Sequence, residues 1–160
     1  MSRKKKKILI VDDEPQVIQM LSDLLVSWGY EVRGAQSAHE ALDTFSGNDF
    51  NLVIADIRMP EMDGFEFMQK LRELDPQCPF IFLTGDASEE TAAKTLEAGA
   101  DDYLVKPVNS SEFRIRIERC LKHHTHIKRL PVLRGVNRAL IISIPLWLIL
   151  GYLIAKFVIK

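Results

Sequence analysis

Residues 8–121 alternate short apolar runs with amphipathic stretches, and this alternation allows very few folds. A run in which every residue is apolar is typical of a strand buried on both faces, because an exposed face would carry polar side chains at alternate positions. Such runs lie at residues 8–11, 52–55, 80–83 and 103–105, and a shorter strand is predicted near Val32. The pattern therefore predicts five strands, most of them covered on both faces.

A stretch with helical periodicity follows each strand. Pro15 suits the first turn of a helix, and the apolar positions 17, 21, 24, 25 and 28 after it fall on one helical face. The later helices are marked by Ala38, Ala41, Leu42 and Phe45; by Phe65, Met68, Leu71 and Leu74; by Ala92, Ala93 and Leu96; and by Phe113, Ile117 and Leu121. Five strands alternating with five helices predict an α/β fold with a doubly wound five-stranded parallel sheet.

The charges are divided unevenly along the chain. Residues 8–118 hold all 22 acidic residues and eight basic ones, whereas residues 1–7 hold five basic residues and residues 119–160 hold eight. An acidic body is the opposite of the basic surface that nucleic-acid-binding domains present, so no direct binding to nucleic acid is expected.

Polar residues follow the predicted strands at the points where those strands end. Asp12 and Asp13 follow the first strand, Asp56 the third, Thr84 the fourth and Lys106 the fifth. Ligands of open parallel sheets bind outside the carboxyl ends of the strands. Three carboxylates there repel one another unless a hard cation such as Mg²⁺ lies between them. A lysine and a hydroxyl beside that ion suit a phosphoryl group, which a carboxylate can accept. The residues predict phosphoryl transfer onto an aspartate.

This set of motifs resembles the receiver domain of two-component response regulators, of the chemotaxis-type single-receiver kind. The resemblance covers roughly residues 6–121. It rests on Asp12-Asp13, on Asp56-Ile57-Arg58-Met59-Pro60 leading into Met62-Asp63-Gly64, on Thr84-Gly85, and on Tyr103 three residues before Lys106-Pro107. It implies a flavodoxin-like sheet with strand order 2-1-3-4-5 and a cis peptide bond between Lys106 and Pro107.

The resemblance also implies a role for each site residue. Asp56 would accept the phosphoryl group from a histidine kinase or a phosphotransfer protein. The metal ligands would be Asp12, Asp13, Asp56 and the backbone carbonyl of Arg58, with Mg²⁺ as the cofactor. Thr84 and Lys106 would bind the phosphoryl oxygens, and Thr84 and Tyr103 would act together as the conformational switch.

The chain changes character after the predicted last helix. We expect a receiver domain over residues 1–121, a basic linker over 122–138 and a hydrophobic transmembrane helix over 139–160. Residues 139–155 are uncharged, and a membrane span needs about 17–25 apolar residues. More basic residues precede this run than follow it, which places the receiver in the cytoplasm beneath an inner or plasma membrane. The alternative is a buried helix of a further domain.

The predicted function is therefore signalling by phosphorylation-dependent protein contact at the membrane, with no enzymatic activity beyond self-phosphorylation from a phosphodonor and slow autodephosphorylation. One alternative is a Mg²⁺-dependent phosphohydrolase. Phosphatases of the haloacid dehalogenase type carry a second aspartate two residues after the nucleophile, where this chain has Arg58. Two further alternatives are an interaction module with an inactive site and the N-terminal part of a larger membrane sensor.

Overall fold

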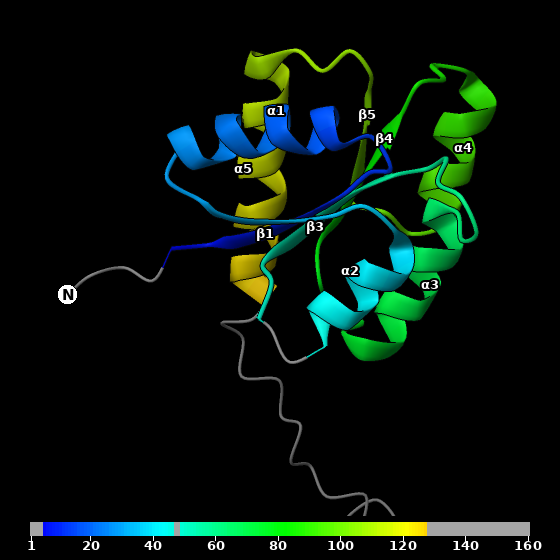
Figure 1. The fold of residues 1–160 in the computed structure, drawn as a ribbon, viewed down its shortest axis with the longest axis horizontal. Coiled ribbons are helices and arrows are strands. Elements are labelled where there is room, and N and C mark those ends of the chain that lie inside the picture. Colours follow the sequence, from blue (N-terminus) through cyan, green and yellow to red (C-terminus); the bar gives the residue numbers. More distant parts are fainter. Residues whose placement is uncertain (1–4, 47–48, 128–160) are drawn as a thin grey trace, which may run out of the picture. The chain divides into compact units, whose positions relative to one another are not determined.

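The computed structural model describes residues 5–46 and 49–127 of the 160-residue chain. In chain order the elements are β1 (Lys7–Val11), α1 (Pro15–Ser27), β2 (Glu31–Ala35), α2 (Ala38–Phe45), β3 (Leu52–Asp56), α3 (Gly64–Leu74), β4 (Phe80–Thr84), α4 (Glu89–Glu97), β5 (Asp102–Val105) and α5 (Ser110–Ile127). The strands form one parallel sheet in the order β2-β1-β3-β4-β5 (Figure 1), which confirms the predicted doubly wound fold and its strand order.

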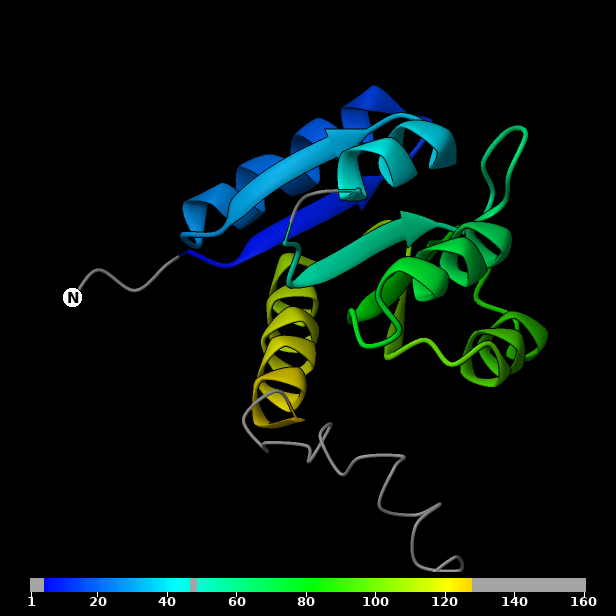
Figure 2. The same ribbon diagram turned by 90° about the horizontal axis from the view of Figure 1, so that it is seen from below.

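Helices cover both faces of the sheet, with α1 and α5 on one face and α2 and α3 on the other (Figures 1 and 2). Successive side chains of a strand point to opposite faces. Ile8 and Ile10 of β1 therefore lie in the core beneath α1 and α5, whereas Leu9 and Val11 lie in the core that includes Phe67 of α3. All four of these β1 side chains are fully buried, as the continuous apolar run predicts.

Helix α4 is present where Ala92, Ala93 and Leu96 predicted a helix, but it buries little of its apolar surface. Leu96 is 70% exposed and Ala93 is also exposed, while the buried residue of α4 is the polar Thr95. The Thr95 hydroxyl donates a hydrogen bond to the backbone carbonyl of Ala92 (2.7 Å), so its burial leaves no unpaired donor. Helix α4 packs beside β5 at the edge of the sheet, where less apolar surface is available to cover it.

Helix α5 continues to Ile127, so residues 122–127, predicted as the start of the basic linker, are helical. The rest of that linker and the predicted transmembrane helix over 139–160 lie outside the described residues. Among the helices of residues 5–46 and 49–127, none combines the length and the apolar character needed to cross a bilayer.

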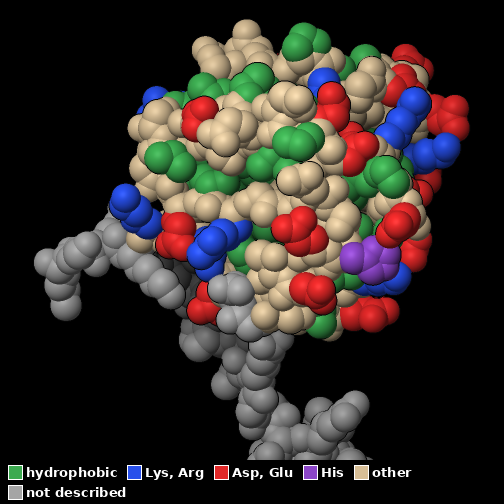
Figure 3. Space-filling view, viewed as in Figure 1, with side chains coloured by type: hydrophobic (Ala, Val, Ile, Leu, Met, Phe, Trp, Pro, Cys, Tyr) green, Lys and Arg blue, Asp and Glu red, His purple; other side chains and the backbone are tan. Residues whose placement is uncertain are grey.

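The surface of the domain carries the acidic charge that the sequence predicts. In Figure 3 acidic side chains gather on the side of the molecule formed by α3 and α4, among a smaller number of lysines and arginines. The exposed acids of these two helices include Glu66, Glu73, Glu89 and Glu90. Lys70 and Lys94 pair with Glu66 and Glu90 one helical turn away, at 2.9 and 2.7 Å.

Candidate functional site

The strand ends bring the predicted site residues to one edge of the sheet. Asp56 is the last residue of β3 and Thr84 the last of β4, and Asp12 and Lys106 directly follow β1 and β5. Because β1, β3, β4 and β5 are parallel neighbours in the sheet, all of these ends lie at its carboxyl edge. Asp12 and Thr84 are almost fully buried, Asp56 is 7% exposed and Asp13 is exposed.

Three carboxylates form a cluster that fits a cation. Asp12, Asp13 and Asp56 each offer an oxygen within 4.8 Å of the others. The buried Oδ2 of Asp12 is paired with the Lys106 ammonium, whose Nζ lies 2.7 Å away. Three carboxylates whose oxygens lie this close together are a donor set that suits Mg²⁺.

Lys106 crosses the carboxyl edge to reach the acidic cluster. Its Nζ lies 2.7 Å from Asp12 Oδ2 and donates a hydrogen bond to Asp56 Oδ2 at 3.1 Å. Burial raises the pKa of Asp56, and the hydrogen bond and charge of Lys106 oppose this rise without cancelling it. Burial lowers the pKa of Lys106, but the two carboxylates outweigh that effect and raise it above its ordinary value. The lysine is therefore held as an ammonium ion beside Asp56.

The loop after Asp56 is shaped by close backbone packing. A Cβ atom on Gly64 would lie 2.3 Å from the backbone oxygen of Asp56 and 3.0 Å from the Cα of Ile57. The Gly64 N–H donates to the Ile57 carbonyl at 2.9 Å, and the Asp63 side chain caps α3 by accepting from the Glu66 N–H at 2.8 Å. The Met62-Asp63-Gly64 motif therefore folds the loop back onto the backbone of the candidate phosphoacceptor.

The hydroxyl of Thr84 is engaged by the loop that follows β4. Thr84 Oγ1 accepts from the Asp86 N–H at 3.0 Å and donates to the Asp86 carbonyl at 3.2 Å. Tyr103 of β5 is partly buried and packs against the core that α2 and α3 cover. The Lys106-Pro107 peptide bond is cis, as the resemblance implied. The switch roles of Thr84 and Tyr103, and the metal contact of the Arg58 carbonyl, stay predictions.

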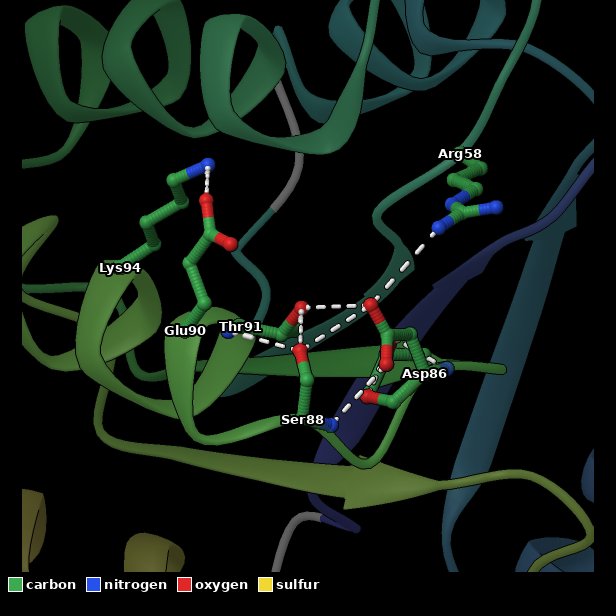
Figure 4. A network of polar contacts seen from close by, with 7 residues as sticks. Arg58, Asp86, Ser88, Glu90, Thr91 and Lys94 are labelled. Atoms are coloured by element: carbon green, nitrogen blue, oxygen red, sulfur yellow. Dashed lines mark hydrogen bonds and ion pairs between the residues drawn. The ribbon is translucent and has the colours of Figure 1, made fainter.

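A second polar network lies beside this site, and its hydrogen bonds were not predicted from the sequence (Figure 4). The Asp86 carboxylate accepts hydrogen bonds from Ser88 N, Ser88 Oγ and Thr91 Oγ1 at 3.0–3.1 Å, and Arg58 lies 3.8 Å away. These hydrogen bonds, led by that from the Ser88 N–H, hold the pKa of Asp86 below its usual range. The sequence signal was Asp86 two residues before Ser88, a spacing that favours local turns and helix caps.

Fold and site together define a flavodoxin-like α/β domain with an acidic, lysine-containing site at the carboxyl edge of its sheet. The family described as the response regulator receiver domain matches residues 8–118, and the chain belongs to that family. Receiver domains generally bind Mg²⁺ at a cluster of aspartates, and they generally work with a histidine kinase or phosphotransfer partner.

Curated relatives resemble the chain over its receiver part. The transcriptional regulatory protein ZraR of Salmonella typhimurium is 41% identical over 123 residues, which cover 77% of this chain and 28% of that protein. The probable transcriptional regulator ycf27 of Cyanophora paradoxa is 42% identical over 120 residues, which cover 74% of this chain and 49% of that protein. The chain thus spans less than half the length of either relative.

Solved structures of single receiver domains match almost end to end. A CheY-like receiver domain from Methanospirillum hungatei superposes with a TM-score of 0.72 at 37% identity, covering 77% of this chain and 98% of that one. The chemotaxis protein CheY4 of Vibrio cholerae gives a TM-score of 0.69 at 35% identity, covering 72% and 98%.

Proposed function

We propose that Asp56 accepts a phosphoryl group from a histidine kinase or a phosphotransfer protein, with Mg²⁺ beside it, and that the phosphorylated domain signals through a changed protein contact. One observation carries the proposal. The nearly buried Asp56 carboxylate lies 3.1 Å from the Lys106 ammonium, within a group of three carboxylates whose oxygens are within 4.8 Å of one another.

Asp12, Asp13 and Asp56 would hold the magnesium ion, with the Arg58 backbone carbonyl as the further ligand that the family resemblance implies. The bound ion supplies charge neutralisation, which reduces repulsion between the site carboxylates and an incoming phosphoryl group. The closeness of the three carboxylates supports this assignment, because one ammonium, that of Lys106, does not balance three negative charges whose oxygens lie within 4.8 Å of one another.

The chain's own residues account for the transfer step. A carboxylate oxygen of Asp56 attacks the phosphorus of a phosphohistidine, a new P–O bond forms, the P–N bond breaks, and the electron pair returns to the imidazole nitrogen. Lys106 lies close enough to neutralise charge on the transferred group. Thr84 Oγ1 can donate to a phosphoryl oxygen only after it releases the Asp86 carbonyl. This exchange would start the switch that includes Tyr103.

A phosphohydrolase is less well supported. A phosphatase working through an aspartyl phosphate needs a general acid to protonate the leaving group. Arg58 stands where phosphatases of the haloacid dehalogenase type have that acid, and a guanidinium does not give up its proton in proteins. We therefore propose that the chain catalyses nothing beyond its own phosphorylation from a phosphodonor and a slow loss of that phosphate.

We also propose that residues 139–160 anchor the chain as a single-pass helix in an inner or plasma membrane, with the receiver on the cytoplasmic side. The uncharged run over 139–155 and the excess of basic residues before it support this. The segment lies outside the described residues. Deleting residues 131–160 should move the protein from the membrane pellet to the supernatant, and a deletion protein that still sediments with membranes would contradict the anchor.

Labelling with acetyl phosphate tests the phosphoacceptor. Wild-type protein with Mg²⁺ should gain a phosphoryl group that hydroxylamine removes, as expected for a mixed anhydride. Asp56→Asn and wild type in EDTA should gain none, whereas Asp43→Asn, which removes an exposed carboxylate on α2, should label normally. Undiminished labelling of Asp56→Asn would contradict the assignment.

A further inference from the structure

Glu14 is the N-cap residue of α1, but its side chain makes no capping hydrogen bond. Ser, Thr, Asp and Asn are preferred at such positions because their short side chains accept from the first free N–H groups of the helix. Pro15 follows and removes one of those donors. The carboxylate of Glu14 has no capping role that would explain its presence.

Instead, this carboxylate faces Lys106. Glu14 Oε1 lies 3.6 Å from Lys106 Nζ, so the ammonium has three carboxylates around it, with Asp12 at 2.7 Å and Asp56 at 3.1 Å. Two of the three, Asp12 and Asp56, are the proposed metal ligands, whereas Glu14 is not in the three-carboxylate cluster. A divalent cation on Asp12 and Asp56 would repel the ammonium that now contacts both.

We infer that Glu14 is a positioning residue, which receives the Lys106 ammonium when Mg²⁺ binds to Asp12 and Asp56. The inference rests on the proposed function, because it requires these two aspartates to bind the metal. Glu14 lowers the free energy needed to displace the Lys106 ammonium from Asp12 and Asp56, because the displaced ammonium can pair with the Glu14 carboxylate as well as with water. It therefore strengthens Mg²⁺ binding without touching the ion.

The backbone keeps Glu14 beside the site. Its N–H donates to Asp12 Oδ1 at 3.0 Å, which holds the start of α1 against the first metal ligand. The Glu14 side chain is 63% exposed and the Lys106 side chain is 19% exposed, so an approach of the lysine toward Glu14 moves its charge toward water. Ion pairs at exposed sites are weak. We expect an effect on Mg²⁺ affinity of severalfold rather than of orders of magnitude.

The test is a double-mutant cycle read out as the Mg²⁺ dissociation constant. Isothermal titration with MgCl₂ alone, without a phosphodonor, is carried out on the full chain in mild detergent at about 150 mM salt, where distant charges are screened. Glu14→Gln should weaken Mg²⁺ binding roughly two- to fivefold. Lys106→Met should strengthen it, because the competing cation is gone. In the Lys106→Met background, Glu14→Gln should change the dissociation constant by less than about 1.5-fold.

Two comparisons distinguish a wrong inference about Glu14 from a wrong proposed function. Asp23→Asn, an exposed acid on α1 away from the carboxyl edge, should leave the dissociation constant unchanged and controls for net charge. An equal effect of Glu14→Gln with and without Lys106 would show that Glu14 acts on the ion directly, and would overturn the inference while leaving the proposed function in place. Wild-type protein that binds no Mg²⁺ would overturn both. Thermal unfolding in EDTA establishes that each variant is folded.

Discussion

Lys106 reaches from the end of β5 across the end of β4 to Asp56 at the end of β3, with its Nζ 3.1 Å from Asp56 Oδ2. The contact joins residues 50 positions apart in the chain. It places a fixed positive charge beside a carboxylate whose burial raises its pKa. The pKa of Asp56 therefore depends on a residue that only the packing of the sheet brings close.

Lys106→Met should raise the pKa of Asp56 further in metal-free protein. Burial remains, whereas the hydrogen bond and the charge that oppose it are lost. The measurement is a pH titration of the Asp56 carboxyl ¹³C shift by NMR in EDTA. Arg58→Met is the matched control, because its guanidinium pairs with Asp86, and it should leave the Asp56 titration nearly unchanged. A lowered Asp56 pKa in Lys106→Met would contradict the expected balance.

Gly64→Ala should destabilise the domain by about 1–3 kcal/mol, the usual cost of forcing an extra carbon into a packed site. The new Cβ would meet the Asp56 backbone oxygen at 2.3 Å, and backbone cannot move aside as a flexible side chain can. Chemical denaturation of both proteins measures the difference. Gly85→Ala, whose Cβ would have no neighbour within 4 Å, should change stability by less than about 0.5 kcal/mol. Equal effects at the two positions would refute the steric explanation.

Glu61→Gly should stabilise the domain by about 0.5–1 kcal/mol. Glu61 has a φ angle of 65°, the left-handed region that a residue with a Cβ adopts only at a cost. The substitution removes an exposed ion pair of 3.7 Å with His39, which contributes little to stability. It also raises the conformational entropy of the unfolded chain, and this offsets part of the stabilisation. His39→Ala measures the ion pair separately. A lower thermal midpoint for Glu61→Gly than for His39→Ala would be the opposite of the expected result.

Cys120 should make the domain lose stability in alkali. Burial raises the pKa of its thiol to about 12 from an ordinary value of 9.0, with the nearby Asp101 and Asp102 charges adding to the rise. Above pH 9 the unfolded chain releases the thiol proton while the folded domain keeps it, so stability falls as pH rises from about 9 towards 12.

Cys120→Ala provides the comparison. The substitution creates a small cavity that lowers stability at every pH. It also removes the contribution of the Cys120 thiol to the fall of stability with rising pH. Denaturation midpoints between about pH 8 and 10.5 should therefore fall less steeply for Cys120→Ala than for wild type. Identical slopes would show that the thiol does not ionise differently in the two states. Slow alkylation of the native protein by iodoacetamide at pH 8 is a second expected result, because Cys120 is only 4% exposed.

The local pattern of the chain was sufficient to predict the sheet and its site residues. Every strand predicted from an apolar run is present within a residue or two, because burial on both faces leaves no room for polar residues. The positions of Asp12, Asp56, Thr84 and Lys106 followed from the same pattern, since residues after parallel strands share one edge. The limits of α5 and the inward face of α4 did not follow.

Those differences have a common cause. Periodicity reports which side chains of one element can be buried together, but not how much surface a neighbour offers to cover them. Leu96 therefore stays exposed on α4 at the edge of the sheet, and α5 runs to Ile127 through residues that lack a strong apolar pattern.

The sequence alone thus determined the helices and strands, the side chains that form the core, and the edge of the sheet that carries the aspartates. Short segments suffice for this, because the apolar pattern of a segment shows which of its side chains are buried, and the chain direction shows where each strand ends. Packing in three dimensions set the contacts between those groups. It placed Lys106 between Asp12 and Asp56, brought Glu14 within 3.6 Å of Lys106, and left too little room for a Cβ atom at position 64. Coulomb forces and steric repulsion act over a few ångströms, and such distances between remote residues exist only once the sheet has formed.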